Sequence, residues 1–280
     1  MDTGTIRDIV SRRASALRGT ARLPPRSVQL LVFLLLSVAG IAGILIAAGR
    51  GTTTSSSTSH VTGSGVSRTE SRSVHDFDQI ELLGAGFVRI AQSALEGLRV
   101  QADDNILHYI GTSVDNGVLR IEVGRADVTL SPITPITFFI NVKKLHGLSI
   151  SGAADVQLSA MHTDSLALAI SGGGRIDLRS LAATSLRVDV NGTGDVVMSG
   201  KVETQRVSIA GVGSYAGDNL DSAEATVSIA GAGSATVQVR DALDVAIEGT
   251  GSVNYIGDPQ VHQNINGVGT VTRVQMTLKS

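Results

Sequence analysis

The stretch Ile229-Ala-Gly231-Ala-Gly233-Ser-Ala-Thr-Val237 decides the fold, because its pattern of a β-branched residue followed by closely spaced glycines recurs along the chain. Seven copies lie between Leu148 and Val274, and their leading glycines are 20, 20, 19, 20, 18 and 18 residues apart. An internal period of this length indicates similar units that stack on one another. The leading glycines are Gly152, Gly172, Gly192, Gly211, Gly231, Gly249 and Gly267.

Apolar residues alternate along each repeat, which is the periodicity of a β-strand rather than of a helix. Counted from the leading glycine as zero, positions −4, −2, +4 and +6 are mostly apolar, and we expect them to point inward. Positions −1 and +3 are small or polar, and we expect them to face solvent. The inward set at position −2 is Ile150, Ile170, Val190, Ile209, Ile229, Ile247 and Ile265.

A unit of this length cannot bury its own apolar edge, so it must stack on the units before and after it. We therefore predict an all-β fold, a parallel β-helix of about seven 18–20-residue coils, with right-handed winding. An N-terminal β cap and one transmembrane helix are expected to precede the coils. A leucine-rich repeat is the alternative, since Leu186-Arg-Val188-Asp-Val-Asn191 fits its spacing, but most other copies lack that asparagine.

Residues 74–146 are expected to cap the first open edge of the stack. Asn116-Gly117 predicts a tight hairpin turn, because these residues tolerate positive φ angles. Residues 271–278 are expected to close the other end. The further elements that we expect are an early copy of the glycine element at 80–90, strands at 98–102 and 136–142, and a turn or short helical piece at 103–108.

The first 73 residues divide into three segments of different composition. Residues 1–27 contain six arginines and are interpreted as a basic cytoplasmic tail. Val28–Ala48 contains 21 residues without a charge, which is long enough to cross a bilayer as a helix. Residues 49–73 are rich in Ser, Thr and Gly, which is typical of a flexible linker. Residues 74–280 then form the β-helical head.

The distribution of arginines predicts how this span is oriented. Six arginines precede the span and only Arg50 follows it closely, so the N-terminus should lie in the cytoplasm. The head would then be periplasmic or extracellular. A cleaved signal peptide is the alternative, because Ala47-Ala48-Gly49 offers small residues, although the apolar run exceeds the usual length of about 7–15 residues. We expect a single-pass protein anchored in the bacterial cytoplasmic membrane through Val28–Ala48.

The overall composition argues against several kinds of chemistry. The chain of 280 residues has a formal net charge of −2 and no cysteine, so neither nucleic-acid binding nor disulfides nor thiolate metal sites are expected. Its six histidines do not have the spacing of metal ligands. We predict no catalytic, cofactor-binding or metal-binding residues, and no cofactor.

Three aspartates are the candidates for an acid pair of the kind that polysaccharide lyases or hydrolases use. Asp155 and Asp195 share position +3, and Asp177 lies at position +5 of the coil between them. Arg175 stands between Asp155 and Asp195 in the predicted ladder. We therefore favour a solvated surface of alternating charge, whereas acids converging in a cleft would indicate an enzyme.

The order of several motifs resembles a known bacterial family. The matching motifs are Phe77-Asp-Gln-Ile80, Asp104-Asn105-Ile-Leu, Asn116-Gly117-Val-Leu and the recurring I-x-G-x-G. Over about residues 75–272 the chain is similar to the "putative auto-transporter adhesin head", or GIN domain, family. The resemblance implies a β-helical, envelope-exposed domain, and it supplies no catalytic residues.

The predicted function is that of a non-enzymatic, membrane-anchored, adhesin-like module that binds an envelope protein or a polysaccharide. A polysaccharide-processing enzyme on a β-helix is the alternative, and an envelope spacer is a third possibility. Aromatic content weighs against sugar binding. The chain has no Trp, and Tyr215 and Tyr255 occupy inward positions, so few exposed aromatic faces are expected.

Overall fold

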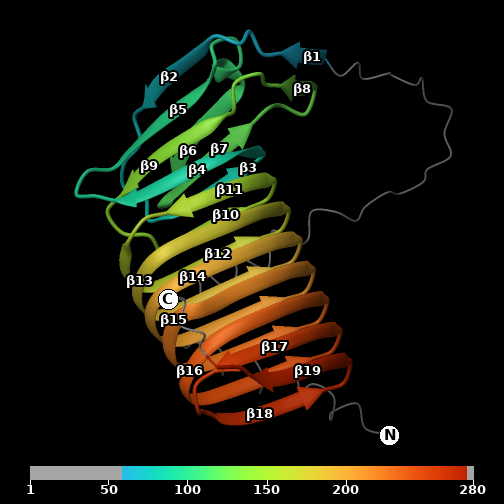
Figure 1. Ribbon diagram of the computed structural model, residues 1–280. Coiled ribbons are helices and arrows are strands. Elements are labelled where there is room, and N and C mark those ends of the chain that lie inside the picture. The colour runs from blue at the N-terminus through green and yellow to red at the C-terminus, as the bar shows by residue number, and fades with distance from the viewer. Residues whose placement is uncertain (1–58, 276–280) are drawn as a thin grey trace, which may run out of the picture. The chain divides into compact units, whose positions relative to one another are not determined.

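The computed structural model describes residues 59–275, and it shows parallel strands stacked in about six turns (Figure 1). Seventeen strands join into one sheet that winds around the stack. Within the described residues the single helical element is a 3-10 turn, Leu107–Tyr109. The stack confirms the β-helix, and the strands in the second half of each repeat rule out the leucine-rich alternative.

The N-terminal segments predicted from composition, residues 1–58, lie outside the part of the chain that the structure describes. Among residues 59–275, no helix has the length and apolar character needed to cross a membrane. The basic tail and the span at Val28–Ala48 therefore stay predictions.

The middle coils are each formed by one long strand that runs almost completely around the stack. These strands are β13 (Gly173–Val190), β14 (Thr193–Ile209), β15 (Val212–Ile229) and β16 (Ala232–Ile247). Toward either end the coils consist of shorter strands. They are β3 (Gln79–Leu83), β4 (Ala85–Gln92), β10 (Gly147–Ile150), β11 (Ala153–Leu158) and β12 (Met161–Ile170) before them, and β17 (Thr250–Ile256), β18 (Gln260–Ile265) and β19 (Val268–Arg273) after them.

Neighbouring coils are in register at the glycine element although their lengths differ. Ile229 pairs with Ile209 in the coil before it and with Ile247 in the coil after it. Register shifts occur elsewhere in the coil, for example between Gly217 and Asp221. Such bulges accommodate the extra residues, so equivalent inward side chains stay aligned from coil to coil.

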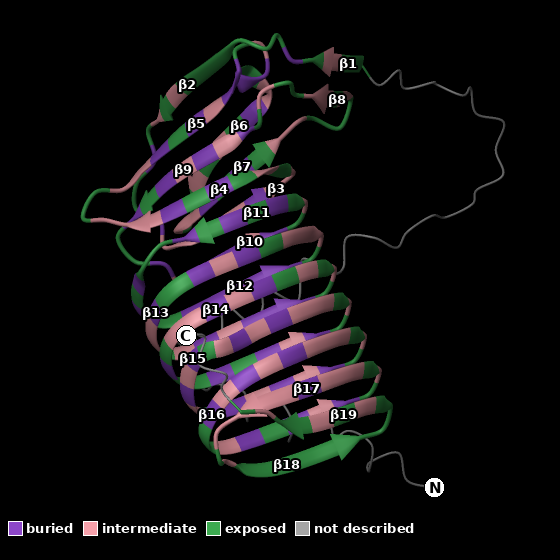
Figure 2. Cartoon of the chain, viewed as in Figure 1, coloured by how far each residue is buried: buried purple, intermediate pink, exposed green. Residues whose placement is uncertain are grey.

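The inward positions fill one continuous hydrophobic core. Ile209 and Ile229 have no exposed surface, whereas Ala210 and Ala230 beside them are exposed. Figure 2 shows this alternation of buried and solvent-facing residues along the coils. The inward and outward assignment is confirmed for the coils up to Val253, which is itself fully buried.

One part of the core contains polar side chains that satisfy one another. Tyr215 occupies its predicted inward position, and its hydroxyl donates a hydrogen bond to Oε1 of Gln205 at 2.8 Å. The Gln205 amide donates to the Ser222 hydroxyl at 2.8 Å, and that hydroxyl donates to the backbone oxygen of Gln238 at 2.8 Å. Burial raises the pKa of Tyr215 and so keeps its hydroxyl a donor. Partners of this kind are what buried polar groups require.

The N-terminal cap is built by a change of strand direction (Figure 1). β7 (Val118–Val123) and β9 (Thr137–Val142) pair in parallel with β3 and β4 and so continue the stack. β6 (Ile110–Asp115), β5 (Gly97–Asp103) and β2 (Ser67–Arg72) then pair antiparallel. The predicted hairpin is confirmed, with φ angles of 49° at Asn116 and 81° at Gly117.

The folded head begins earlier than the composition predicted. β1 (Ser59–Thr62) pairs with β8 (Val128–Ser131), and β2 pairs with β5. Both β1 and β2 lie within residues 49–73, which were assigned to the linker, and that boundary is therefore wrong. β1 and β2 were not recognisable from composition, because they contain few apolar residues. Strands at an edge are held mainly by backbone hydrogen bonds, which composition does not reveal.

A buried carboxylate ties the loops of the cap together. Asp103 has no exposed surface and accepts hydrogen bonds from the backbone N–H groups of Gly65 at 3.1 Å, Ile133 at 2.8 Å and Thr134 at 3.1 Å. Burial alone would raise the pKa of Asp103. The hydrogen bonds from Thr134, Ile133 and Gly65 outweigh it and hold the pKa below its ordinary value.

We expect the cap to lose stability in acid through Asp103. Because the pKa of this carboxyl is lower in the folded state, its contribution is complete above pH 3.8 and is lost as the pH falls through the folded pKa. Amide hydrogen exchange of residues 63–66, 133 and 134, measured from neutral pH down through the folded pKa of Asp103, tests the expectation. In Asp103→Asn, these amides should exchange faster at neutral pH and show no further rise in exchange as the pH falls. A rise that persists in the variant would exclude Asp103 as its source.

The C-terminal end of the stack is open within the described residues. All six residues of β18 are exposed, including Ile265 at a predicted inward position, which is 37% exposed. The last glycine element leads only into β19, with no returning strand up to residue 275, which explains a stack of about six turns rather than about seven. The closing segment predicted at 271–278 continues past the described residues.

Candidate functional site

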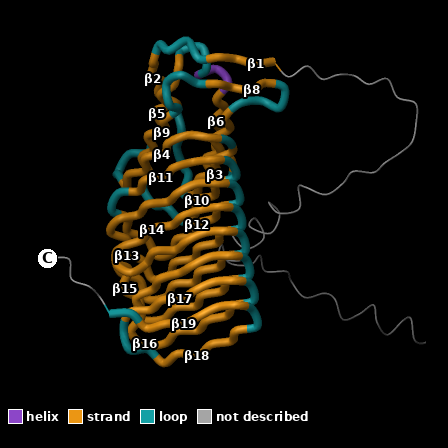
Figure 3. Tube along the Cα trace, turned by 45° about the vertical axis from the view of Figure 1, so that its right-hand side comes forward, coloured by secondary structure: helices purple, strands orange, loops and turns teal. Residues whose placement is uncertain are grey.

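The glycine elements lie one above another along one edge of the stack, where the loops between coils align (Figure 3). A Cβ atom on Gly231 would overlap the carbonyl oxygen of Gly211, and one on Gly211 would overlap that of Gly192. None of the seven leading glycines, all of which the structure describes, has a positive φ. Close approach of neighbouring backbones, rather than a special backbone conformation, therefore requires glycine at this edge.

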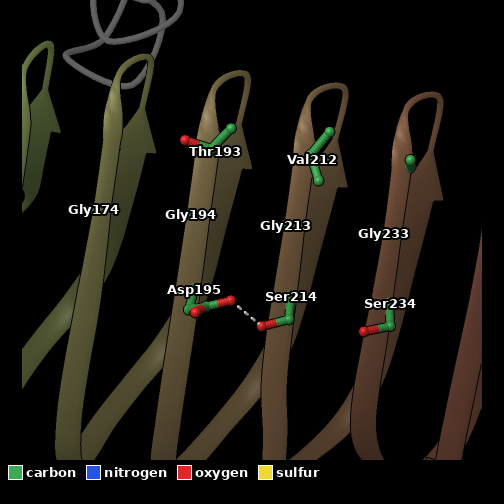
Figure 4. Close-up of a pocket in the computed structure, with 10 residues that line it drawn as sticks. Gly174, Thr193, Gly194, Asp195, Val212, Gly213, Ser214, Gly233 and Ser234 are labelled. Carbon is green, nitrogen blue, oxygen red and sulfur yellow. Dashed lines mark hydrogen bonds between the residues drawn. The ribbon is translucent and has the colours of Figure 1, made fainter.

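A shallow groove of about 450 Å³ lies over the outer side of this edge (Figure 4). In this view the carboxylate of Asp195 points toward Ser214, whose hydroxyl donates a hydrogen bond to it. Ser234 continues the row on the next coil. The remaining lining residues are glycines and small side chains, so the groove presents hydroxyl and backbone groups beside one carboxylate. They are Gly174, Thr193, Gly194, Val212, Gly213, Ala232 and Gly233.

The structure does not bring the three candidate aspartates together. Asp155 pairs in register with Arg175, and Arg175 pairs with Asp195, so a cation stands between the two carboxylates. Asp177 accepts hydrogen bonds from Nε and Nη2 of Arg179 at 3.3 and 3.2 Å, and this pairing raises the pKa of Arg179. The alternating ladder has the predicted order, and it does not place two acids around one bond as acid–base catalysis requires.

Clustered metal ligands are also absent from the residues that the structure covers. Between residues 59 and 275, no three His, Asp or Glu side chains gather as the ligands of a metal ion would. The expectation that the chain uses no cofactor stays a prediction.

A second groove, of about 590 Å³, lies where the cap meets the first coils. Its floor is a row of residues that pair across the neighbouring strands β5, β9, β4, β11 and β13. The row consists of Arg99, Phe139, Arg89, Gln157 and Asp177, in that order. Phe138 and Ile140, the chain neighbours of Phe139, are buried. The alternation along a strand therefore turns the whole row outward.

Phe139 lies between two arginines in this row. The guanidinium carbon of Arg99 is 5.3 Å from the ring centroid, and that of Arg89 is 5.9 Å from it. Both distances are within the range of a cation–π contact. Within residues 59–275, neither arginine forms an ion pair with a carboxylate. The ring thus orients two guanidinium groups whose N–H donors remain free of acidic partners.

This groove was not predicted from the sequence, although part of its signal was present. Only Trp and Tyr were considered as exposed aromatic faces. In the alternating strand with Phe138 and Phe139, one ring has to point outward. The approach of Arg99 was not predictable, because it depends on the antiparallel pairing of β5 with β9.

Comparison with known proteins places this fold in a family. Residues 76–259 match the family described as "Putative auto-transporter adhesin, head GIN domain", and the chain belongs to this family. The resemblance drawn from the sequence motifs is thereby confirmed. No curated protein matches the chain.

Solved structures of bacterial proteins have the same fold. A "putative adhesin" of Bacteroides fragilis is 26% identical with a TM-score of 0.73, and the match covers 76% of this chain and 100% of that one. A "putative adhesin" of Parabacteroides merdae is 24% identical with a TM-score of 0.59, covering 77% and 99%. A "putative lipid binding protein" of Parabacteroides distasonis is 22% identical with a TM-score of 0.63, covering 77% and 99%. The latter two support the fold alone, and the chain is an adhesin-like β-helical module.

Proposed function

We propose that this protein is a membrane-anchored, non-catalytic binding module of the bacterial cell envelope. The observation that carries the proposal is the charge order on the outward ladder, where Arg175 separates Asp155 from Asp195. Such a ladder presents repeated polar contacts to a partner and lacks a paired acid for bond cleavage. The family description and the similarity to the adhesin-like protein of Bacteroides fragilis point in the same direction.

The enzymatic alternative has less support from the two grooves. A polysaccharide lyase or hydrolase needs acid and base groups that converge on one bond. The groove over the glycine edge contains Asp195 alone among carboxylates, and in the groove at the cap Asp177 is occupied by Arg179. Binding without turnover is therefore the function that these surfaces favour.

The anchoring part of the proposal rests on the N-terminal sequence. Val28–Ala48 is uncharged and long enough to span the bilayer, and the six arginines before it favour a cytoplasmic N-terminus. The folded head starts at or before Ser59, so the Ser/Thr/Gly-rich tether is shorter than the sequence predicted.

Protease added outside the cytoplasmic membrane is expected to remove the head from intact cells. If an outer membrane is present, it is permeabilised first. Immunoblotting should show loss of the head, while a tag at the N-terminus stays protected and remains with the membrane. Disruption of the cytoplasmic membrane, which exposes both ends, is the control. Full protection of the head, or a mature N-terminus near Gly49, would contradict the anchored topology.

A further inference from the structure

The groove at the cap has a charge opposite to that of the chain. Arg89, Arg99 and Arg179 face one carboxylate, Asp177, so the charged residues that line the groove have a net charge of +2. The whole chain has a formal net charge of −2. The local excess therefore does not reflect a generally basic protein. Because Arg179 already binds Asp177, the excess charge resides on Arg89 and Arg99.

These two arginines are oriented as an anion-binding pair. Both stack against Phe139, at 5.3 Å for Arg99 and 5.9 Å for Arg89, and they lie on strands that flank its strand. Their α-carbons are thus separated by two strand spacings, or about 10 Å. A guanidinium group presents a planar fork of N–H donors that matches a carboxylate or a sulfate. Two such groups, carried on strands on either side of Phe139, suit anionic groups repeated along one ligand.

The other residues of the groove suit a sugar chain. Asn141 and Gln157 are exposed beside the arginines and offer amide groups to neutral hydroxyls. The row from Arg99 to Asp177 crosses five strands, about 19 Å at the usual strand spacing, which is long enough for several sugar units in an open groove. A flat anionic membrane is a poorer match, because Asp155 is exposed on the same face outside the groove and would repel it.

We propose that the groove of Arg89, Phe139 and Arg99 binds an acidic polysaccharide through its carboxylate or sulfate groups. The proposal rests on the proposed function, since it requires a head that lies outside the cytoplasm and binds without cleaving. It adds the chemical class of the ligand and the residues that recognise it. Phe139 acts as a positioning residue that holds both guanidinium groups toward the ligand.

Binding of defined polysaccharides to the full chain in detergent micelles tests this assignment. The probes are polygalacturonate for carboxylates, dextran sulfate for sulfates and dextran as the neutral control, measured by isothermal titration calorimetry. We expect at least one polyanion to bind and dextran not to bind. Arg89→Gln combined with Arg99→Gln should weaken binding at least about tenfold. Added salt should weaken the binding of the polyanion to the unmodified chain, because salt screens charge–charge attraction.

A matched variant separates the groove from overall charge. Lys201→Gln combined with Arg206→Gln removes the same charge from exposed positions of β14 and should leave the affinity within about twofold. Arg89→Lys combined with Arg99→Lys keeps the charge but loses the planar fork of N–H donors. Its affinity should therefore lie between that of the unmodified chain and that of the double glutamine variant. All three variants change exposed side chains, so each should keep the thermal unfolding midpoint of the unmodified chain. Measuring that midpoint checks that each variant is folded.

Four results would overturn the assignment. They are no binding of either polyanion, unchanged affinity in the Arg89 and Arg99 glutamine variant, an equal loss in the Lys201 and Arg206 control, and tighter arginine-dependent binding to anionic phospholipid vesicles than to either polysaccharide. The protease experiment is independent of these measurements. If the head is accessible to protease from outside but binds neither polyanion, the proposed function stands and only the assignment of an acidic polysaccharide as the ligand fails.

Discussion

Gly231→Ala is expected to destabilise the head by about 3 kcal/mol or more, because the new methyl group has no room. Its Cβ would overlap the carbonyl oxygen of Gly211 and lie 2.6 Å from that of Ala210, both on the coil before it. Backbone atoms cannot rotate away as a flexible side chain can. The coils would have to separate and strain the hydrogen bond from the Ala232 N–H to the Gly211 oxygen, now 2.9 Å. Denaturant unfolding measures the loss.

Gly97→Ala is the matched control for the glycine edge. A Cβ at Gly97 meets nothing within 4 Å, and this residue has no positive φ. The same chemical change should therefore alter the free energy of unfolding by less than about 0.5 kcal/mol. Equal losses in the two variants would show that the close approach of neighbouring coils is not the reason for glycine at position 231.

Ile229→Ala should cost about 2–5 kcal/mol, because it leaves a cavity in the middle of the stack. Ile229 has no exposed surface and lies between Ile209 and Ile247 in the same inward ladder. The in-register coils on both sides limit how far the surroundings can relax into the space. Equilibrium unfolding in denaturant, with an unchanged slope against denaturant concentration, would report the loss.

Ser228→Ala tests the same prediction from the opposite face of the strand. Ser228 is half-buried and pairs with Ser208 and Ala246 on the outward side. Its truncation should change the free energy of unfolding by less than about 0.5 kcal/mol. Because the two positions are adjacent in the chain, a cost at Ser228 as large as that at Ile229 would mean that the inward and outward assignment is wrong.

Much of the solenoid was predictable because its signal is local and repeated. The glycine period predicted the coils, and the alternation around Ile229 predicted which side chains enter the core. The early copy at 80–90 was also recognisable, and it pairs in register with the coil that contains Gly152, with Leu82 opposite Ile150. Each of these features depends on a pattern of a few residues, and a single sequence contains several copies of that pattern.

The candidate site was predictable only in part. The order Asp155, Arg175, Asp195 along the outward ladder followed from their shared position in the repeat, and the register confirms it. The buried role of Gln205 beside Tyr215 did not follow, since nothing in the local sequence distinguishes an inward glutamine with partners from an exposed one. Whether a polar side chain can be buried in a core depends on the hydrogen-bond partners that the fold places around it.

The sequence by itself determined the coil, its inward and outward faces and the glycine edge, because these depend on short patterns that recur every 18–20 residues. It also determined the family, through the order of motifs such as Phe77-Asp-Gln-Ile80 and Asn116-Gly117-Val-Leu. The tertiary structure alone decided where the head begins, how Asp103 holds the loops of the cap, and that Arg99 and Arg89, from the two strands that flank β9, both contact the ring of Phe139. These contacts join segments far apart in the chain through strand pairings that occur once. A contact formed once leaves no period in the sequence, so only the paired strands reveal it.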